Sequence, residues 1–173
     1  MKTLSCFIIA LTFFIFSENS YSQSWLPKPV ESVYADALTG TWTSEPYEFM
    51  GNTNTDVVTC SKILNSQYLE IDFKRTDNTG FTYEGKEIVS VSPEGNMNGM
   101  YYDIMGKEKA LSYTGSKDGD KLILMGISPV GKGSREIIID GNTMTHNVKF
   151  VMSDDADSSA PEQNIKIIYN KTN

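Results

Sequence analysis

The segment YLEIDFKR, residues 68–75, alternates apolar and polar side chains. Leu69, Ile71 and Phe73 fall on one face of an extended chain, and the charged side chains between them fall on the other face. A period of two is typical of a β-strand with one buried face and one face in water. The segment at 143–152, TMTHNVKFVM, has the same alternation. These two segments predict a sheet that covers a core on one side only.

About ten such runs lie between residues 41 and 169, and most end at a short segment rich in Gly, Asn, Asp or Pro. Short connectors of this kind join antiparallel neighbours in hairpins. No helix-length run separates the strands, and a sheet of this size must curl or close to protect its edges. We therefore predict an all-β fold, an antiparallel meander that closes into a β-barrel of about eight to ten strands. The predicted strands are 41–49, 56–64, 68–75, 81–91, 97–105, 109–116, 121–128, 134–140, 143–152 and 164–169.

The N-terminal 22 residues have the pattern of a cleaved signal peptide. Lys2 supplies a positive charge, residues 7–16 (FIIALTFFIF) are apolar, and Ser20-Tyr21-Ser22 is a small-x-small cleavage site. An apolar run of this length is too short for a membrane-spanning helix, which needs about 20 residues. We predict residues 1–22 as a leader, 23–38 as a lead-in with a short helix near 31–38, and 39–173 as the barrel domain. The mature protein is predicted to be exported, periplasmic or extracellular, without membrane insertion.

Charge and cysteine content exclude several classes of site. The net charge is −7, which disfavours binding to nucleic acid. Cys6 lies in the leader, so Cys60 has no intramolecular disulfide partner, and we interpret it as a small buried apolar side chain. With one histidine and one remaining cysteine, a zinc site within the chain is not expected, and no cofactor is predicted. The segment 126–133 (GISPVGKG) lacks the Ser or Thr and the helix of a phosphate-binding loop.

Several polar residues fall in register with apolar neighbours and are therefore predicted to face the barrel interior. The candidate interior site consists of Glu87, Tyr101, Asp103, Arg135 and His146. Buried charges need partners, so one interpretation is a structural network, with Arg135 paired to Glu87 or Asp103. The other interpretation is a ligand pocket in which apolar walls give affinity and a few polar groups give orientation.

Several segments together resemble the DUF1579 group of bacterial proteins. They are LTGTW at 38–42, YEFMG at 47–51, ILNSQYLE at 63–70, FTYEG at 81–85 and YDIMG at 102–106. The order and spacing of these segments match the group from about residue 38 to 169. Ser66 and Tyr68 depart from the group's Gly and Trp. The resemblance implies a lipocalin-like barrel with a cavity for a small molecule, and it carries over no catalytic residue.

Three functional hypotheses follow from the sequence. The first is an exported protein that binds a small apolar or amphipathic ligand in the barrel, with Arg135, Tyr101 and His146 as polar contacts. The second is an isomerase or hydrolase that uses Glu87, Asp103 or His146 for acid–base chemistry. The third is a protein-interaction domain that uses the outer barrel surface or the acidic loop at 153–163. No feature of the sequence predicts an oligomeric state.

Overall fold

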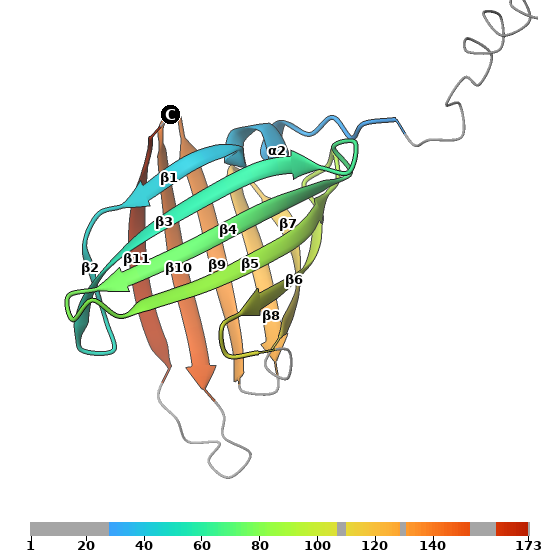
Figure 1. Ribbon diagram of the computed structural model, residues 1–173. Helices are drawn as coiled ribbons and strands as arrows, with labels where there is room; N and C mark the ends of the chain where they lie inside the picture. Colours follow the sequence, from blue (N-terminus) through green and yellow to red (C-terminus); the bar gives the residue numbers. More distant parts are fainter. Residues whose placement is uncertain (1–27, 107–109, 129–130, 153–161, 173) are drawn as a thin grey trace, which may run out of the picture.

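The computed structural model describes residues 28–106, 110–128, 131–152 and 162–172 (Figure 1). The predicted leader at 1–22 lies outside the described residues, as does most of the acidic loop at 153–163. The elements are α2 (Val33–Leu38), β1 (Gly40–Ser44), β2 (Tyr47–Phe49), β3 (Asn52–Ile63), β4 (Tyr68–Asp77), β5 (Thr82–Val91), β6 (Met97–Asp103), β7 (Leu111–Asp118), β8 (Lys121–Ser128), β9 (Gly131–Asp140), β10 (Thr143–Met152) and β11 (Gln163–Lys171).

The strands form one antiparallel meander that closes on itself. Its order is β1-β11-β10-β9-β8-β7-β6-β5-β4-β3-β2, and β1 also pairs with β3. Trp42 of β1 lies opposite Val58 of β3 on one side and Lys171 of β11 on the other. Since β2 extends the sheet from β3 outside this ring, ten strands make up the closed barrel (Figure 1). The predicted all-β, lipocalin-like barrel with one short helix is confirmed.

Several predicted strand boundaries differ from the structure; β3, for example, begins at Asn52 rather than at residue 56, and β7 ends at Asp118 rather than at residue 116. Two of the differences have local reasons. The predicted strand 41–49 is two strands, because Glu45 and Pro46 interrupt it and proline has no backbone N–H for the ladder. The N–H of Glu45 donates instead to the carbonyl oxygen of Ile168. Strand β9 begins at Gly131, three residues before the predicted start at Ser134. The glycines of this segment indicated a loop in the sequence. In the barrel, however, Gly133 lies in the strand and accommodates Phe150 of the neighbouring strand.

Helix α2 closes one end of the barrel. Ser32 caps its N-terminus by accepting a hydrogen bond from the N–H of Ala35, and the Ser32 hydroxyl donates to the carbonyl of Ser92 in the β5–β6 turn. Ala35 and Leu38 are buried against the barrel core. The indole N–H of Trp42 donates to the carbonyl of Leu38 at 2.8 Å. The helix is therefore fixed to the first strand and to a turn on the far side of the opening.

Side-chain burial falls from the α2 end of the barrel to the opposite end. Near α2 the inward side chains are fully enclosed, as Trp42 and Val89 show at 0 % exposure. Toward the other end the inward residues of several strands are only partly buried; they are Phe49, Phe73, Tyr83, Tyr101, Leu111, Val148, Phe150 and Ile165. We call these two regions the closed half and the open end.

Glycine on the inward face lets large rings fill the barrel. A Cβ at Gly99 of β6 would lie 2.8 Å from the ring of Tyr113 and 2.9 Å from the carbonyl oxygen of Ile88. The ring of Tyr101 occupies the matching space above Gly85 of β5. Alternation of small and large residues across neighbouring strands is one way in which a small barrel fills its interior. In this protein it brings phenol groups to the centre of the barrel.

Candidate functional site

All five residues predicted for the interior site lie on the inward face of the barrel. Glu87 lies opposite Tyr101 in the pairing of β5 with β6, and Asp103 follows two residues later on the same face. Arg135 of β9 lies opposite Val148 of β10, beside His146 on that strand. The structure joins Glu87 directly to Arg135, links Tyr101 to Asp103 through Tyr83, and places His146 apart from these, against Tyr169.

Glu87 and Arg135 form a bidentate ion pair across the barrel. Arg135 donates from Nη1 to Oε1 of Glu87 at 2.9 Å and from Nη2 to Oε2 at 2.8 Å. The hydroxyl of Tyr113 donates to Oε2 at 2.7 Å. Burial raises the pKa of Glu87, but the charge and hydrogen bonds of Arg135 and the bond from Tyr113 outweigh it, so the pKa lies below its usual value. The predicted partner Glu87, rather than Asp103, is therefore the one that neutralises Arg135.

A second charged group centres on Asp56, which is fully enclosed. Its carboxylate accepts hydrogen bonds from the hydroxyl of Tyr47 at 2.8 Å and from that of Tyr169 at 2.9 Å. Nε of Arg75 donates to Oδ1 at 3.0 Å. The guanidinium of Arg75 also lies 4.7 Å from the ring centroid of Phe49. Burial, followed by the negative charge of Asp56, raises the pKa of Tyr47, so this phenol stays protonated and donates.

The sequence interpretation missed the Asp56 group, although the signal was present. Arg75 has the same parity as Leu69, Ile71 and Phe73, and Asp56 has the same parity as Val58. Alternation therefore placed both charges inside the barrel. Their pairing depends on register, because Asp56 lies directly opposite Arg75 only in the observed alignment of β3 with β4.

Tyr101 and Asp103 belong to a third group near the open end. Tyr101 donates to the hydroxyl of Tyr83 at 2.9 Å, and Tyr83 donates to a carboxylate oxygen of Asp103. The other oxygen of Asp103 accepts the N–H of Met105 at 2.8 Å. Burial raises the pKa of Tyr101 to about 12. The three side chains form a directed chain of hydrogen bonds, and its hydroxyls retain lone pairs for a further donor.

His146 is buried, with 6 % of its surface exposed, and its ring lies 4.8 Å from that of Tyr169. Among the described residues, its Nε2 is a buried side-chain atom without a hydrogen-bond partner. His146 lines an interior cavity of about 50 Å³, whose wall also includes Cys60, Glu87 and Arg135. Cys60 is 3 % exposed, and burial raises the pKa of its thiol to about 12, which makes it an unreactive thiol.

The size of this cavity limits what the closed half can hold. Pockets for drug-sized ligands measure about 300–1,000 Å³. The interior cavity of about 50 Å³ is far smaller, because Trp42, Leu69, Met97 and Met144 fill the closed half. The interior residues had two interpretations, a structural network and a ligand pocket. For Glu87 and Arg135, the structural network is the one that applies. The closed half therefore has no room for a ligand of ordinary size.

Protonation of His146 gives a testable pH dependence of stability. Burial and the nearby charge of Arg135 hold the pKa of His146 well below 6.5, whereas in the unfolded chain it titrates near 6.5. Below that pH the unfolded state binds more protons, so stability present at neutral pH is lost as the pH falls. We expect the free energy of unfolding to decrease by about 1.4 kcal/mol per pH unit below about pH 6.

The measurement is urea unfolding at a series of pH values between about 5 and 7, where histidine titrates. His146 is the single histidine of the chain, and the groups that face it across the cavity are Arg135, Tyr169, Glu87 and Cys60. None of these four titrates in that window, since the pKa of Glu87 is lowered and those of the other three are raised. His146→Gln should therefore remove the slope. Equal slopes in both proteins would contradict the prediction.

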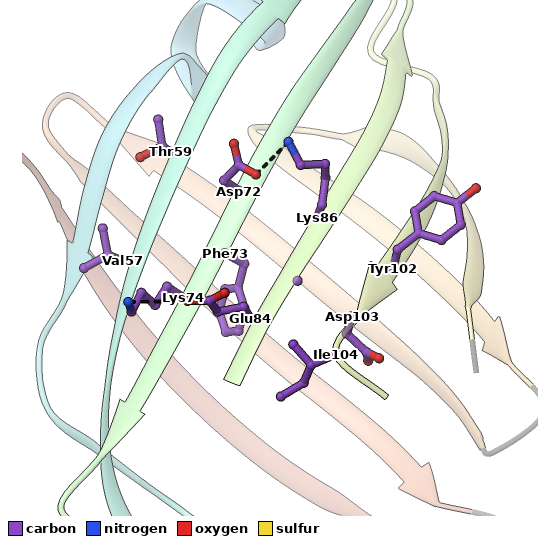
Figure 2. A pocket seen from close by; sticks show the side chains of 11 residues that line it. Val57, Thr59, Asp72, Phe73, Lys74, Glu84, Lys86, Tyr102, Asp103 and Ile104 are labelled. Carbon is purple, nitrogen blue, oxygen red and sulfur yellow. Dashed lines mark ion pairs between the residues drawn. The ribbon is translucent and has the colours of Figure 1, made fainter. Parts of the chain in front are cut away.

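A larger hollow of about 560 Å³ lies on the outer surface, over β3 to β6 (Figure 2). Four of its charged side chains are paired with one another, Lys86 with Asp72 at 2.8 Å and Lys74 with Glu84 at 3.4 Å, and the candidate residue Asp103 also lines the hollow. Tyr102 adds an exposed ring at one side of the hollow. The hollow is open to solvent, and its lysines are paired with carboxylates while Asp103 accepts hydrogen bonds from Tyr83 and Met105, so few polar groups there remain to orient a ligand.

Comparison with known proteins adds no family assignment. No family model matches the chain, and no curated protein matches it. Among the described residues, no group of three His, Cys, Asp or Glu side chains is arranged to hold a metal ion. A search of the same residues for a helix long and apolar enough to span a bilayer finds none.

Proposed function

We propose that the protein binds a small apolar or amphipathic molecule at the open end of its barrel, after export to the periplasm or the cell exterior. The observation that supports this proposal is the gradient of burial inside the barrel. Packing is complete beside α2, but aromatic and aliphatic side chains at the opposite end stay partly exposed on the inward face. Apolar surface left open inside a barrel mouth is a common setting for ligand sites.

Polar groups at the same end would orient the ligand. Arg135 keeps 27 % of its side chain exposed while Glu87 holds its guanidinium in place. The hydroxyls of Tyr101 and Tyr83 have free lone pairs beside Asp103. Each positive charge in this region already has a carboxylate partner, Arg75 with Asp56 and Arg135 with Glu87. A ligand with a neutral polar group therefore fits better than one that needs an unpaired cation.

The contacts of the acid–base residues give no support to an enzyme. Glu87 is 5 % exposed and holds Arg135 and Tyr113, and His146 is buried. Asp103 receives a hydrogen bond on each oxygen, from Tyr83 and from the N–H of Met105. A general acid or base must reach a substrate proton within hydrogen-bond distance. We therefore place binding ahead of catalysis.

A protein-interaction role is the second candidate, because apolar side chains are exposed on the outer faces of β6 and β8, the two strands on either side of β7. Tyr102 is 45 % exposed, Met125 is 56 % exposed and Ile127 is 70 % exposed. Contiguous exposed apolar surface is the mark of an interaction site. The two candidates use opposite faces of the sheet, so one pair of variants separates them.

The test is a fluorescence titration with the neutral apolar probe N-phenyl-1-naphthylamine. Val148 lies on the inward face near the open end, and Val148→Trp should fill that region and weaken probe binding at least about 10-fold, or about 1.4 kcal/mol. Ile127→Trp puts the same ring on the outer face and should leave the affinity unchanged. Loss of binding in Ile127→Trp alone would favour the outer face.

A second readout does not depend on the folding of either variant. In the wild-type protein, bound probe should shift the NMR signals of Phe49, Tyr101 and Phe150 and leave those of Met125 and Ile127 in place. Absence of saturable binding to the wild-type protein would refute the proposed function.

A further inference from the structure

The interior cavity combines a polar wall with an unsatisfied nitrogen. His146 presents an Nε2 that lacks a hydrogen-bond partner among the described residues, although the side chain is 6 % exposed. Leaving a buried polar group unpaired costs about 1–3 kcal/mol. The cost falls on either tautomer, because Nε2–H needs an acceptor and a bare Nε2 needs a donor. A partner from solution would remove this cost.

The volume of the cavity sets the size of that partner. A cavity needs about 10–15 Å³ to hold one water molecule. The cavity beside His146 measures about 50 Å³, so it has room for one to a few water molecules or for a small alcohol, but not for a drug-sized ligand. Trp42, Met97 and Met144 enclose it, which excludes an extended ligand.

The charges around the cavity set the chemistry of the partner. Glu87 and Arg135 on the wall already neutralise each other through two hydrogen bonds. An added ion would be buried without a counter-ion, which is costly. Burial and the charge of Arg135 also keep His146 uncharged at neutral pH. A neutral molecule that both donates and accepts hydrogen bonds meets these conditions.

A second hydrogen-bond partner is available on the same wall. An ionised carboxylate has about four acceptor sites. In Glu87 three are used, two by Arg135 and one by Tyr113. The remaining site lets a hydroxyl donate to Glu87 while it bonds to His146. A buried water with two to four polar partners is a stable part of a structure.

We propose that this cavity is an internal binding site for a neutral hydroxyl group, supplied by water or by a small alcohol, with Nε2 of His146 as its hydrogen-bond partner. The site joins His146 and Tyr169 to the Glu87–Arg135 pair through the bound hydroxyl. Arg135 and Phe73 border both this cavity and the open end, but the hydrogen-bond partners proposed here, His146 and Glu87, are not groups proposed to contact a ligand at the open end. Loss of one proposal therefore leaves the other intact.

The test uses NMR of the wild-type protein, in which the single histidine gives one imidazole signal set. We expect nuclear Overhauser contacts between the His146 ring and a long-lived bound water. Methanol is then added as the alcohol probe. A saturable shift of the His146 signals would show that alcohols enter, and an unchanged spectrum with persistent water contacts would assign the site to water; each result supports the hydroxyl site.

Xenon provides the opposing test, because it enters dry apolar cavities. If xenon occupies the wild-type cavity and the imidazole shows no water contact, the proposal is overturned. Met144→Leu changes another wall residue and should keep the water contacts, since it leaves Nε2 of His146 in place. Loss of the contacts in this control would also overturn the proposal, because the imidazole would then not be the partner that holds the molecule.

Discussion

Replacing Asp56 with asparagine should destabilise the protein by about 3–5 kcal/mol, the cost of leaving a buried charge without its partner. Asp56 is 0 % exposed, and Arg75 opposite it is 18 % exposed. Asparagine keeps the shape of the side chain but removes the charge and one of its two acceptor oxygens. Two phenol hydroxyls and a guanidinium would then compete for one carbonyl oxygen.

The loss should extend beyond the carboxylate. The guanidinium of Arg75 lies within 5.4 Å of the ring centroids of Tyr47, Phe49 and Phe73. Its place among the rings is fixed by its bond to Asp56. Without that bond, the ordering of β2 against β3 and β4 at the open end should weaken as well. Denaturant unfolding monitored by circular dichroism measures the total change.

Asp72→Asn is the matched control. Asp72 lies on the outer face of β4, is 56 % exposed and pairs with Lys86. Exposed ion pairs contribute about 0–1 kcal/mol, so this variant should stay within about 0.5 kcal/mol of the wild type. Equal losses in the two variants would show that burial does not govern the contribution of the Asp56 carboxylate.

The fold follows from the alternation of apolar and polar residues, which is visible in the sequence. Alternation in the segments that contain Ile71 and Val148 places their apolar residues inside, and the structure keeps both on the inward face. Closure of the barrel is not visible in this alternation, since it depends on the pairing of β1, at Trp42, with β3 and with the last strand, β11. We predicted closure from the exposed edges that an open sheet would leave, which gave a range of strand numbers but no register.

The candidate site was recoverable only in part for the same reason. Alternation assigns a side chain to the interior, but it does not say which residue on another strand will meet it. Arg135 and Glu87 are 48 positions apart in sequence and pair across the barrel. The free volume inside the barrel could not be predicted from the sequence, because it depends on how the rings of Tyr101 and Tyr113 fill the spaces over Gly85 and Gly99. The alternation left open whether the interior held a structural network or a ligand pocket.

Replacing Arg135 with methionine should also destabilise the protein strongly, by about 3 kcal/mol. This value is at the low end for a broken buried pair, because 27 % of the Arg135 side chain is exposed. Among the described residues, Glu87 would keep the hydroxyl of Tyr113 as its one remaining hydrogen-bond partner while 5 % exposed. Its pKa should rise, since the charge and hydrogen bonds that lower it would be gone.

The double variant Arg135→Met with Glu87→Leu distinguishes a broken pair from a lost contact. Replacing a buried pair by apolar side chains of similar volume is often neutral, so the double variant should regain most of the stability that Arg135→Met loses. Urea unfolding of the wild type, both single variants and the double variant gives the coupling energy. Lys121→Met is the control, because it removes the cation of a partly exposed ion pair with Glu136 on the outer face. This variant should change stability by less than about 0.5 kcal/mol.

Probe binding by the double variant then relates this pair to function. If Arg135 only supports the barrel, the stable double variant should bind N-phenyl-1-naphthylamine as the wild type does. If the exposed part of its guanidinium faces the ligand, affinity for a probe with a carbonyl group should fall, while affinity for N-phenyl-1-naphthylamine, which has no carbonyl for the guanidinium to bind, stays. If the double-mutant cycle is additive and stability is not recovered, the contribution of Glu87 to the free energy of unfolding does not depend on Arg135. The two side chains would then not stabilise the barrel as a pair.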